Sequence, residues 1–371
     1  MDAIAAIAYD AESPFAIRPV QLDEPRDDEV IVRIHGCGIC HTDLVIKSGM
    51  SDFPFPGVLG HEGAGVVEKT GSAVDDVAPG DHVVISFLSC GSCHACENDE
   101  PAYCQHMMEL NYAGARPDGS ATLHDQGEPL GSMLFAQSSF ATYALTRARN
   151  LVKVPKHLPL ELLGPLGCGI QTGAGAVLRS LALEAGATLV VAGAGSVGLS
   201  AVMAAQLAGC GRIAVIEPMP QRRQLALELG ATEALDPADE NLTQALAALE
   251  PNGFDAALDT SGNPAALECC LASLGTRGVL GLLGAAQPET ALPGTVNSVL
   301  SRGQSVRGII EGDSNPRQFI PELIAHYEAG RFPFDRLIRI YPFAEINRAV
   351  ADHERGECVK AVLTMLPDAA D

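Results

Sequence analysis

The sequence predicts an α/β protein with two domains, and three observations support this. The chain has 371 residues, more than one hydrophobic core usually organises. Residues 1–150 read as short β-rich segments broken by glycine and proline, which indicates a small antiparallel barrel or sandwich. From about Leu183 onward, apolar strands, glycine turns and helical segments alternate. This alternation predicts a parallel sheet covered by helices on both faces.

The individual elements follow from the same patterns. In the first region, β-rich segments are expected at 29–40, 61–74 and 80–87. In the second region, strands are expected at 187–195, 212–218, 254–262 and 277–284, and helices at 196–209, 221–231 and 264–275. After Gly312 the pattern turns irregular, until a final strand at 358–366.

Composition and charge exclude several classes of function. The formal net charge of −22 disfavours binding to nucleic acid or to anionic membranes. The N-terminal segment lacks the basic and apolar regions of a signal peptide, and no apolar run is long enough to span a membrane. We therefore expect a cytoplasmic location. The 11 cysteines are then expected to be reduced, as metal ligands or core residues.

A glycine-rich motif directly follows the expected strand at 187–195. Gly193, Gly195 and Gly198 form a G-x-G-x-x-G run that opens a helix with Ser196 and Val197. Such a run lets the backbone approach a pyrophosphate at the helix N-terminus, although a helix-packing turn is the plainer interpretation. The next expected strand ends in Glu217, 24 residues after Gly193, where a carboxylate can accept hydrogen bonds from ribose hydroxyls.

The pair of motifs predicts dinucleotide binding and favours NAD over NADP. Two nearby arginines, Arg222 and Arg223, are the counter-indication, because a guanidinium could bind a 2′-phosphate. The alternative is that they form a solvated helix face.

Four cysteines lie in one short segment. Their spacing, C-x2-C-x2-C-x7-C, brings four thiolates together without help from distant parts of the chain, and it comprises Cys90, Cys93, Cys96 and Cys104. Four ligands close the coordination shell of zinc, so a structural zinc site is predicted. An iron–sulfur cluster is the competing use of four cysteines.

A second group of candidate ligands is scattered along the chain. Cys40, His61 and Cys168 could hold a catalytic zinc with one open position, and Glu62 is adjacent in sequence. Their spacing does not show that they meet in space. Taken singly, a cysteine or histidine in a glycine-rich turn is more often a packing residue.

A family resemblance joins these motifs. The segments GCGICHTD, GHEGAGVVEKTGSAV, CGSCHACENDEPAYC, GPLGCGIQTGAG and VVAGAGSVGLSA resemble the zinc-containing medium-chain alcohol dehydrogenases, in the family's order and over essentially the whole chain. The segments GARPDG, FAQSSFATYAL, LELLGPLGCGIQTGAG and RFPFDRLI are most similar to the bacterial aryl-alcohol and geraniol dehydrogenase branch.

The resemblance implies a fold and a set of domain boundaries. A GroES-like catalytic domain with both zinc sites would comprise residues 1–169 and 313–371, and a Rossmann NAD-binding domain would comprise 170–312. The active site would lie in the cleft between them. The resemblance also implies a homo-oligomer formed through the coenzyme domain.

The resemblance assigns roles to the catalytic residues. Cys40, His61 and Cys168 would bind the catalytic zinc, with Glu62 behind it as a second carboxylate. Asp43 would orient His61. Thr42 would accept the proton of the substrate alcohol, and a helix N-cap role for this threonine is compatible with that.

Three further residues would contact the coenzyme. Thr172 would lie by the nicotinamide, Lys360 would meet the coenzyme phosphate, and His41 would lie next to the pyrophosphate. One departure from the family concerns Val45, which stands where well-known members have the histidine that ends the proton relay. The proton must then leave through the ribose hydroxyl, water or another group.

The implied reaction is reversible hydride transfer between a hydrophobic primary alcohol and NAD, with two zinc ions per chain. Aryl alcohols are the expected substrates, and allylic terpene alcohols such as geraniol are the alternative. Phe87, Leu134 and Phe135 are candidate pocket residues or core residues. Two alternative hypotheses assign the chain to a different functional class. One is a zinc-bearing structural or nucleic-acid module, and the other is a zinc-free quinone or enone reductase.

Overall fold

The computed structural model describes residues 1–365, and the chain divides into two compact units. The first unit comprises residues 1–168, 315–322 and the chain from 335 onward. The second unit comprises residues 169–314 and 323–334. Residues 366–371, at the end of the predicted first domain and final strand, lie outside the described residues.

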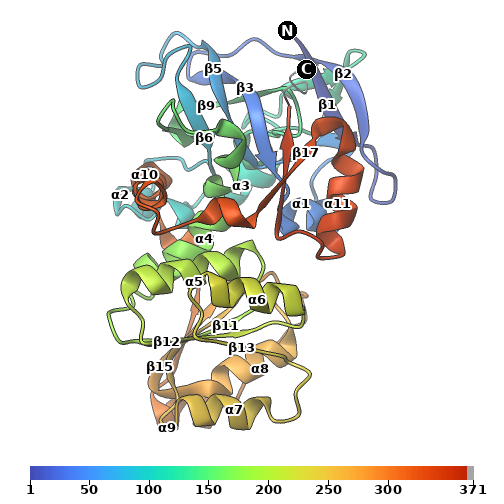
Figure 1. Cartoon of the computed structure of the whole chain (residues 1–371). Helices are drawn as coiled ribbons and strands as arrows, with labels where there is room; N and C mark the ends of the chain where they lie inside the picture. Colours follow the sequence, from blue (N-terminus) through green and yellow to red (C-terminus); the bar gives the residue numbers. More distant parts are fainter. Residues whose placement is uncertain (366–371) are drawn as a thin grey trace. The chain divides into compact units, whose positions relative to one another are not determined.

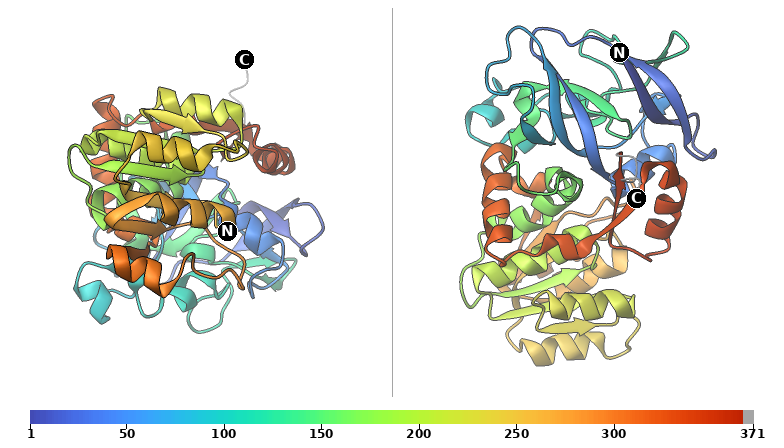
Figure 2. Two further views of the ribbon diagram at one scale, coloured as in Figure 1. Left: turned by 90° about the horizontal axis from the view of Figure 1, so that it is seen from below. Right: turned by 45° about the horizontal axis from the view of Figure 1, so that its top comes forward.

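The first unit contains two sheets (Figure 1). The five-stranded sheet has the order β4-β1-β2-β7-β8, with β1 (Asp2–Ala8), β2 (Ala16–Leu22), β4 (Gly57–Val58), β7 (Leu123–Asp125) and β8 (Glu128–Leu130). Figure 2 shows its longest pair, β1 and β2, in dark blue from further directions.

The second sheet of this unit has the order β10-β6-β5-β3-β18-β17, with β9 also paired to β3. Its strands are β3 (Glu29–Gly38), β5 (Glu62–Thr70), β6 (His82–Ile85), β9 (Tyr143–Arg147), β10 (Leu151–Lys153), β17 (Ile338–Pro342) and β18 (Lys360–Thr364). All pairs are antiparallel except β17 with β18. The helices are α1 (His41–Lys47), α2 (His94–Glu97), α3 (Met107–Tyr112) and α11 (Ile346–Glu354).

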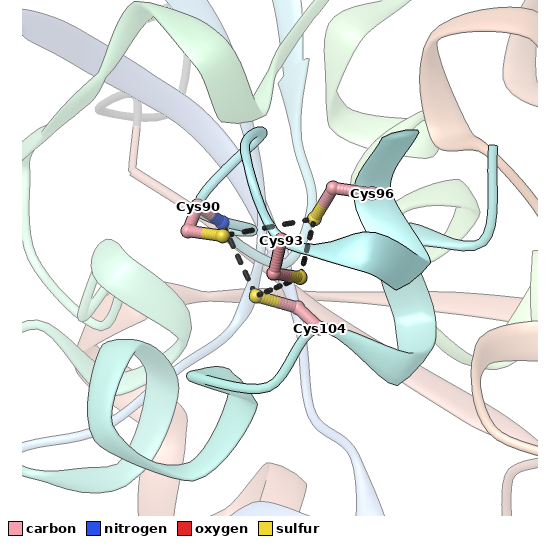
Figure 3. A group of neighbouring side chains, drawn as sticks. All are labelled: Cys90, Cys93, Cys96 and Cys104. Carbon is pink, nitrogen blue, oxygen red and sulfur yellow. Dashed lines mark hydrogen bonds between the residues drawn. The ribbon is translucent and has the colours of Figure 1, made fainter. Parts of the chain in front are cut away.

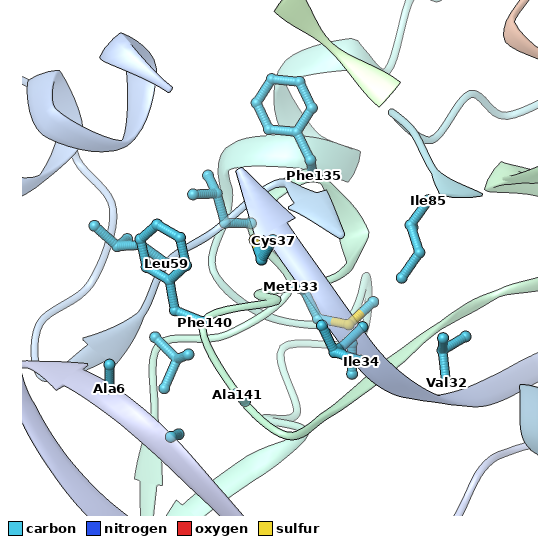
Figure 4. Close-up of a cluster of buried hydrophobic side chains, with 14 of the residues drawn as sticks. Ala6, Val32, Ile34, Cys37, Leu59, Ile85, Met133, Phe135, Phe140 and Ala141 are labelled. Atoms are coloured by element: carbon cyan, nitrogen blue, oxygen red, sulfur yellow. The ribbon is translucent and has the colours of Figure 1, made fainter. Parts of the chain in front are cut away.

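The first unit contains a large cluster of buried hydrophobic residues, part of which is drawn in Figure 4. It joins side chains from β3, such as Val32 and Ile34, to Phe140 and Ile85 from other parts of the unit. The metal-ligand candidates described below extend from elements anchored in this core. Their backbone is therefore held by the packing of the whole unit.

The second unit is built on a six-stranded parallel sheet with the order β13-β12-β11-β14-β15-β16. Its strands are β11 (Thr188–Ala192), β12 (Arg212–Ile216), β13 (Glu233–Leu235), β14 (Phe254–Asp259), β15 (Leu274–Leu282) and β16 (Ser305–Gly308). This is the 3-2-1-4-5-6 order of doubly wound nucleotide-binding sheets, which bind ligands beyond the carboxyl ends of the strands, where the order reverses.

Helices cover both faces of this parallel sheet. Figure 1 shows α5 (Ser196–Ala208) and α6 (Pro220–Glu228) on one side, and α7 (Leu242–Leu249) and α8 (Pro264–Ser273) on the other. The unit also contains α4 (Gly169–Gly175) and α9 (Val296–Arg302). The parallel sheet predicted from the alternating pattern is therefore confirmed, although the short strand β13 and helix α7 were not predicted.

The expectation of irregular structure after Gly312 was wrong. This region contains α10 (Pro316–Glu328) and α11. The helical signal of α10 is weakened by Pro321 inside it, because an interior proline removes a backbone donor. Burial of Phe319, Ile320, Leu323 and Ile324 stabilises the helix nevertheless. Among the described residues, no helix is long and apolar enough to span a membrane.

Candidate active site and metal centres

The glycine-rich motif lies at the carboxyl end of β11, as a dinucleotide site requires. Gly193 has φ +96°, and a Cβ atom there would lie 2.5 Å from Thr260 Oγ1. A Cβ atom on Gly198 would lie 1.9 Å from the Gly193 carbonyl oxygen. At Gly195, by contrast, an added Cβ would meet no atom within 4 Å.

Glycine is therefore favoured at these three positions for different physical reasons. Gly193 and Gly198 allow the tight turn and the close packing of α5, whereas Gly195 faces open space at the helix N-terminus. Ser196 and Val197 are the first residues of α5 and are half-buried. Free N–H groups and the positive end of the helix dipole suit this open space to a pyrophosphate.

Glu217 follows β12 and is 4% exposed. Its carboxylate accepts hydrogen bonds from Ala194 N at 2.7 Å and from Met219 N at 3.0 Å. These bonds tie the end of β12 to the glycine-rich loop. A carboxylate oxygen can accept more than one hydrogen bond, so Glu217 retains capacity for a ribose hydroxyl.

The two arginines near Glu217 lie at the start of α6 and are half-buried. Arg223 donates to the carbonyl oxygens of Glu217 at 2.7 Å and Pro218 at 2.8 Å, and pairs with Asp236 at 3.0 Å. Its guanidinium is therefore committed to the protein. Arg222 lies next to it in the first turn of the same helix.

Thr172 lies on α4 of the second unit, half-buried. Its hydroxyl is 3.5 Å from Glu311 Oε2, and the neighbouring Gln171 donates to the same carboxylate oxygen at 3.0 Å. The predicted contact of Thr172 with the nicotinamide remains a prediction.

The four closely spaced cysteines form one cluster in the first unit (Figure 3). Their sulfur atoms lie within 4.8 Å of one another, as ligands of a single ion would. The Sγ–Sγ distances are 3.9 Å from Cys90 to Cys96, 3.6 Å from Cys93 to Cys96, and 4.0 Å from Cys93 to Cys104. Because all four corners are cysteine, the group offers a bound ion no open position.

Backbone N–H groups surround these sulfur atoms. Cys90 N and His106 N donate to the Cys104 sulfur at 3.3 and 3.4 Å, and Gln105 N donates to Cys93 at 3.5 Å. Hydrogen bonds, first from Ser92, lower the pKa of Cys90 to about 6. Burial instead raises the pKa of Cys104 to about 12. The loop thus stabilises thiolate character at part of the cluster, as metal ligation requires.

The scattered candidates also meet in the first unit. Ligand atoms of Cys40, His61, Glu62 and Cys168 all lie within 4.8 Å of one another. Cys40 is the N-cap residue of α1, His61 and Glu62 lie where β5 begins, and Cys168 follows a 3-10 turn at 164–167. Cys168 is 7% exposed, and His61 and Glu62 are fully buried.

Asp43 fixes the orientation of His61. Its Oδ1 lies 2.9 Å from His61 Nδ1 and accepts from Gly60 N at 3.0 Å, while its Oδ2 accepts from Cys40 N at 3.0 Å. Cys40 caps the helix and Asp43 completes the capping box, so an N-cap role for Thr42 is wrong. Asp43 therefore ties two of the candidate ligands together.

The other imidazole nitrogen, His61 Nε2, is buried and has no hydrogen-bond partner among the described residues. A buried polar atom without a partner is costly, unless a ligand absent from the protein chain satisfies it. With Nδ1 bound to Asp43, Nε2 can donate its lone pair to a metal ion. The site thus fits a metal on the chemistry of its own atoms.

Charges in the site favour a thiolate at Cys40, which is the form in which a cysteine binds a metal. A hydrogen bond from Cys168 lowers the pKa of Cys40 well below its ordinary value, against the effect of burial and with help from His61 and Lys360. Burial lowers the pKa of His61, but the negative charges of Asp43 and Cys40 outweigh it and raise that pKa.

Lys360 lies within the site. It is 1% exposed, and its Nζ donates to both carboxylate oxygens of Glu62 at 2.8 Å and to Ile39 O at 3.1 Å. Burial raises the pKa of Glu62. Burial also lowers the pKa of Lys360, but the charge of Glu62 outweighs it and raises that pKa. These contacts make Lys360 the cation that neutralises Glu62, whereas its predicted contact with a coenzyme phosphate gains no support from them.

The remaining predicted residues lie on α1. The Thr42 hydroxyl is 3.8 Å from the Cys40 sulfur, which places it beside the candidate ligands. His41, the first residue of the helix, is exposed. Val45 is half-buried and offers no proton-carrying group.

Sequence reasoning gave Phe135 as a candidate pocket or core residue, but it missed Gln137, Tyr112 and the contact of Phe135 with the His61 ring. Phe135 stacks on the His61 ring with centroids 4.5 Å apart, and Tyr112 meets Phe135 edge-on at 5.2 Å. Gln137 binds the backbone on both sides of Glu62. No motif marks the contacts of Phe135 and Gln137 with the backbone and ring near His61, because these contacts join segments more than 70 residues apart in sequence.

Comparisons with known proteins agree with this geometry. Residues 26–156 match the alcohol dehydrogenase GroES-like domain, and residues 196–328 match the zinc-binding dehydrogenase domain. The geraniol dehydrogenase of Castellaniella defragrans is 47% identical over 98% of each chain. The chain belongs to the zinc-binding alcohol dehydrogenase family.

Solved structures of this family show the same fold. An alcohol dehydrogenase zinc-binding domain protein from Burkholderia ambifaria has a TM-score of 0.97 and 48% identity, with 99% of each chain covered. The benzyl alcohol dehydrogenase of Acinetobacter calcoaceticus has a TM-score of 0.95 and 40% identity, covering 99% of this chain and 100% of that one.

These matches confirm the predicted fold, a GroES-like domain with a Rossmann domain, and the predicted family. The dehydrogenase thus acts on small-molecule alcohols, with the zinc and nicotinamide cofactor that its family implies.

Proposed function

We propose that this dehydrogenase reversibly oxidises hydrophobic primary alcohols to aldehydes with NAD, that it holds two zinc ions per chain, and that aryl alcohols are its substrates. The observation that carries the proposal is the group of Cys40, His61 and Cys168, in which the buried His61 Nε2 has no partner among the described residues. Such a group matches three protein ligands with one position open to substrate.

Zinc in this site would supply a Lewis acid that polarises the substrate oxygen. The chain's own residues do the rest. The Thr42 hydroxyl, beside Cys40, accepts the alcohol proton, and Asp43 holds His61 in the tautomer that leaves Nε2 free. Lys360 forms an ion pair with Glu62, and its positive charge compensates the negative charge of this carboxylate behind the site. Val45 offers no group that carries a proton, so the proton would have to leave by another route: the ribose hydroxyl of a bound coenzyme, water or another group.

The contacts of Glu217 and Arg223 support NAD as the coenzyme. Glu217 is buried at the end of β12, where a 2′-phosphate would meet its negative charge. Arg223 is already bound to two backbone carbonyls and to Asp236, so it is not free to neutralise that phosphate.

The aryl preference is supported by Phe135 and by likeness to the benzyl alcohol dehydrogenase of Acinetobacter calcoaceticus. The Phe135 ring covers His61, which gives the site an apolar, flat wall. Phe87, Leu134 and Phe135 all lie in the hydrophobic core at 3% exposure or less, and of the three Phe135 also stacks on the His61 ring.

Allylic terpene alcohols are the second candidate, because the geraniol dehydrogenase of Castellaniella defragrans is 47% identical to this chain. Both substrate classes place the hydroxylated carbon next to a π-system. An aldehyde conjugated with a ring or alkene is the more stable oxidation product in either case.

We also propose a homo-oligomer formed through the second unit. In that unit Leu292, Val296 and Leu300 are 68–83% exposed on and before α9, and β16 ends the strand order of the sheet. Exposed apolar side chains beside a strand edge suit a second copy of the chain. A change to monomer on substituting Val296→Glu, measured by sedimentation, is the expected result. A wild-type monomer would contradict the proposal.

A metal assay and a substrate panel test the main proposal. Elemental analysis of protein prepared without chelator should find two zinc ions per chain. One zinc or none would contradict the proposal of two ions, and none would favour a zinc-free quinone or enone reductase. In the panel, benzyl, cinnamyl or geranyl alcohol should exceed ethanol in kcat/KM by orders of magnitude, and polyols should be poor. If ethanol were best, the substrate assignment would be wrong.

A further inference from the structure

A buried segment with unusual backbone angles, 133–139, lies against His61. Met133, Phe135, Ala136 and Ser138 all have φ between +50° and +63°. Residues with a Cβ atom seldom adopt this region, and they persist there only when the surroundings over-determine the backbone. All four are at most 3% exposed, so packing and hydrogen bonds hold this shape.

The segment is tied to the backbone directly before His61. Ser138 Oγ donates to Val58 O at 2.6 Å, Ser139 N donates to Gly60 O at 2.7 Å, and Phe140 N donates to Leu59 O at 2.9 Å. Within the segment, Leu134 N donates to Ser138 Oγ at 3.0 Å. The strained backbone and the residues leading to His61 therefore form one hydrogen-bonded body.

Gln137 extends this body past His61. It is 2% exposed, and its Nε2 donates to His61 O at 2.9 Å while its Oε1 accepts from Gly63 N at 3.0 Å. These are the two peptide groups that flank Glu62. Ser139 Oγ donates to the same Oε1 at 2.7 Å, which fixes the amide in the orientation that serves both peptides.

Gly63 shows how close this contact is. A Cβ atom there would lie 2.3 Å from Ser139 Oγ and 2.9 Å from Gln137 Oε1. The glycine thus allows the side-chain amide of Gln137 to reach the backbone.

We propose that Gln137 is a positioning residue for the metal centre, and that it holds His61 and Glu62 through their shared backbone. The inference rests on the proposed catalytic metal. Asp43 fixes the rotation of the imidazole and Phe135 covers its face, but neither holds the peptide groups on both sides of Glu62. Gln137 does, so its loss lets His61 Nε2 and the Glu62 carboxylate move relative to Cys40 and Cys168.

The test compares Gln137→Met with Gln304→Met. Methionine keeps the approximate size of glutamine and removes the amide. Gln304 is a matched control, because it is a buried glutamine of the second unit whose side-chain amide also binds the backbone, through the carbonyls of Leu274 and Gly275. Both variants should lose similar thermal stability.

Only Gln137→Met should change the metal site. Zinc release to a chelator should accelerate about 10- to 100-fold for one of the two ions, while the four-cysteine ion serves as an internal reference. In cobalt-substituted protein, the absorption bands of the catalytic site should shift. Wild-type release rates and spectra in Gln137→Met would overturn the inference.

Two further results keep the test decisive. If wild-type protein binds no ion at Cys40, His61 and Cys168, the proposed function fails and the inference fails with it. If Gln137→Met does not fold, Ser139→Ala removes only the hydroxyl that orients the amide, and release should then accelerate a few-fold. Unchanged release in Ser139→Ala would count against Gln137.

Discussion

The two candidate metal sites of the first unit are built in opposite ways. The four-cysteine site comes from one loop, residues 90–104, and two of its cysteines, Cys90 and Cys96, are partly exposed. The second site draws Cys40, His61 and Cys168 from three separate parts of the chain, and of these only Cys40 is partly exposed. The first site can order its own loop, whereas the second can form only after the unit has folded.

The atoms around the two candidate metal sites also differ. Backbone N–H groups surround the sulfur atoms of the loop site, and cysteines fill all four corners. The assembled site has instead an unpartnered Nε2, a hydroxyl at Thr42 and a charged pair of Glu62 and Lys360. A closed set of ligands suits stability, and an open set beside titratable groups suits chemistry.

Loss of a loop ligand should have the largest effect on the fold. Cys93→Ala leaves three ligands, and structural zinc is worth about 10–16 kcal/mol in small isolated modules. We expect little soluble protein and a much lower melting temperature. Soluble yield and thermal unfolding measure this. A Cys93→Ala protein with wild-type stability would mean that the loop needs no metal.

Loss of a ligand from the second site, which is assembled from Cys40, His61 and Cys168, should have the largest effect on activity. Cys168→Ala should remain folded and bind NAD, because the core and the loop site are untouched, but activity should fall to background. Circular dichroism, NAD titration and elemental analysis separate these effects. Substantial turnover by a Cys168→Ala protein that holds one zinc per chain would contradict the contrast drawn between the two sites.

Asp43→Asn tests the bond that orients His61. The amide keeps the size of the side chain but weakens the hydrogen bond to Nδ1 and the anchoring of Cys40 N. We expect a 10- to 100-fold loss in metal affinity or activity. Zinc competition measures the affinity, and the loop site should be unaffected. Equal weakening of both sites would show a general loss of stability instead.

The smallest effect is expected in the second unit. Glu217→Ala removes the carboxylate beside the proposed ribose site. The ratio of kcat/KM for NAD to that for NADP should fall by about tenfold, which corresponds to a free-energy difference of about 1.4 kcal/mol. Steady-state kinetics with the two coenzymes measure this ratio. If wild type already favours NADP, then Arg222 dominates this site and the assignment is wrong.

Local patterns allowed much of the fold to be predicted. The alternation that gave β11, α5, β12 and β14 is written in consecutive residues, as is the spacing of the four cysteines. Helix α10 was missed because Pro321 hides its periodicity, and tertiary packing compensates for that.

The assembled site was predictable only through resemblance. No spacing in the sequence shows that Cys40, His61 and Cys168 meet, and nothing marks Gln137 as their neighbour. The position of Lys360 depends on the pairing of β18 with β3, which joins opposite ends of the chain. Long-range register of this kind has no local signal.

That pairing also determines the order in which the molecule can be completed. Glu62 is synthesised early, but the cation that compensates its burial belongs to the last described strand, 298 residues later. Until that strand leaves the ribosome and docks beside β3, the carboxylate has either to stay hydrated or to lose its charge. A chain truncated before Lys360 would therefore lose more than the strand β18. It would carry an uncompensated acid at the proposed metal site.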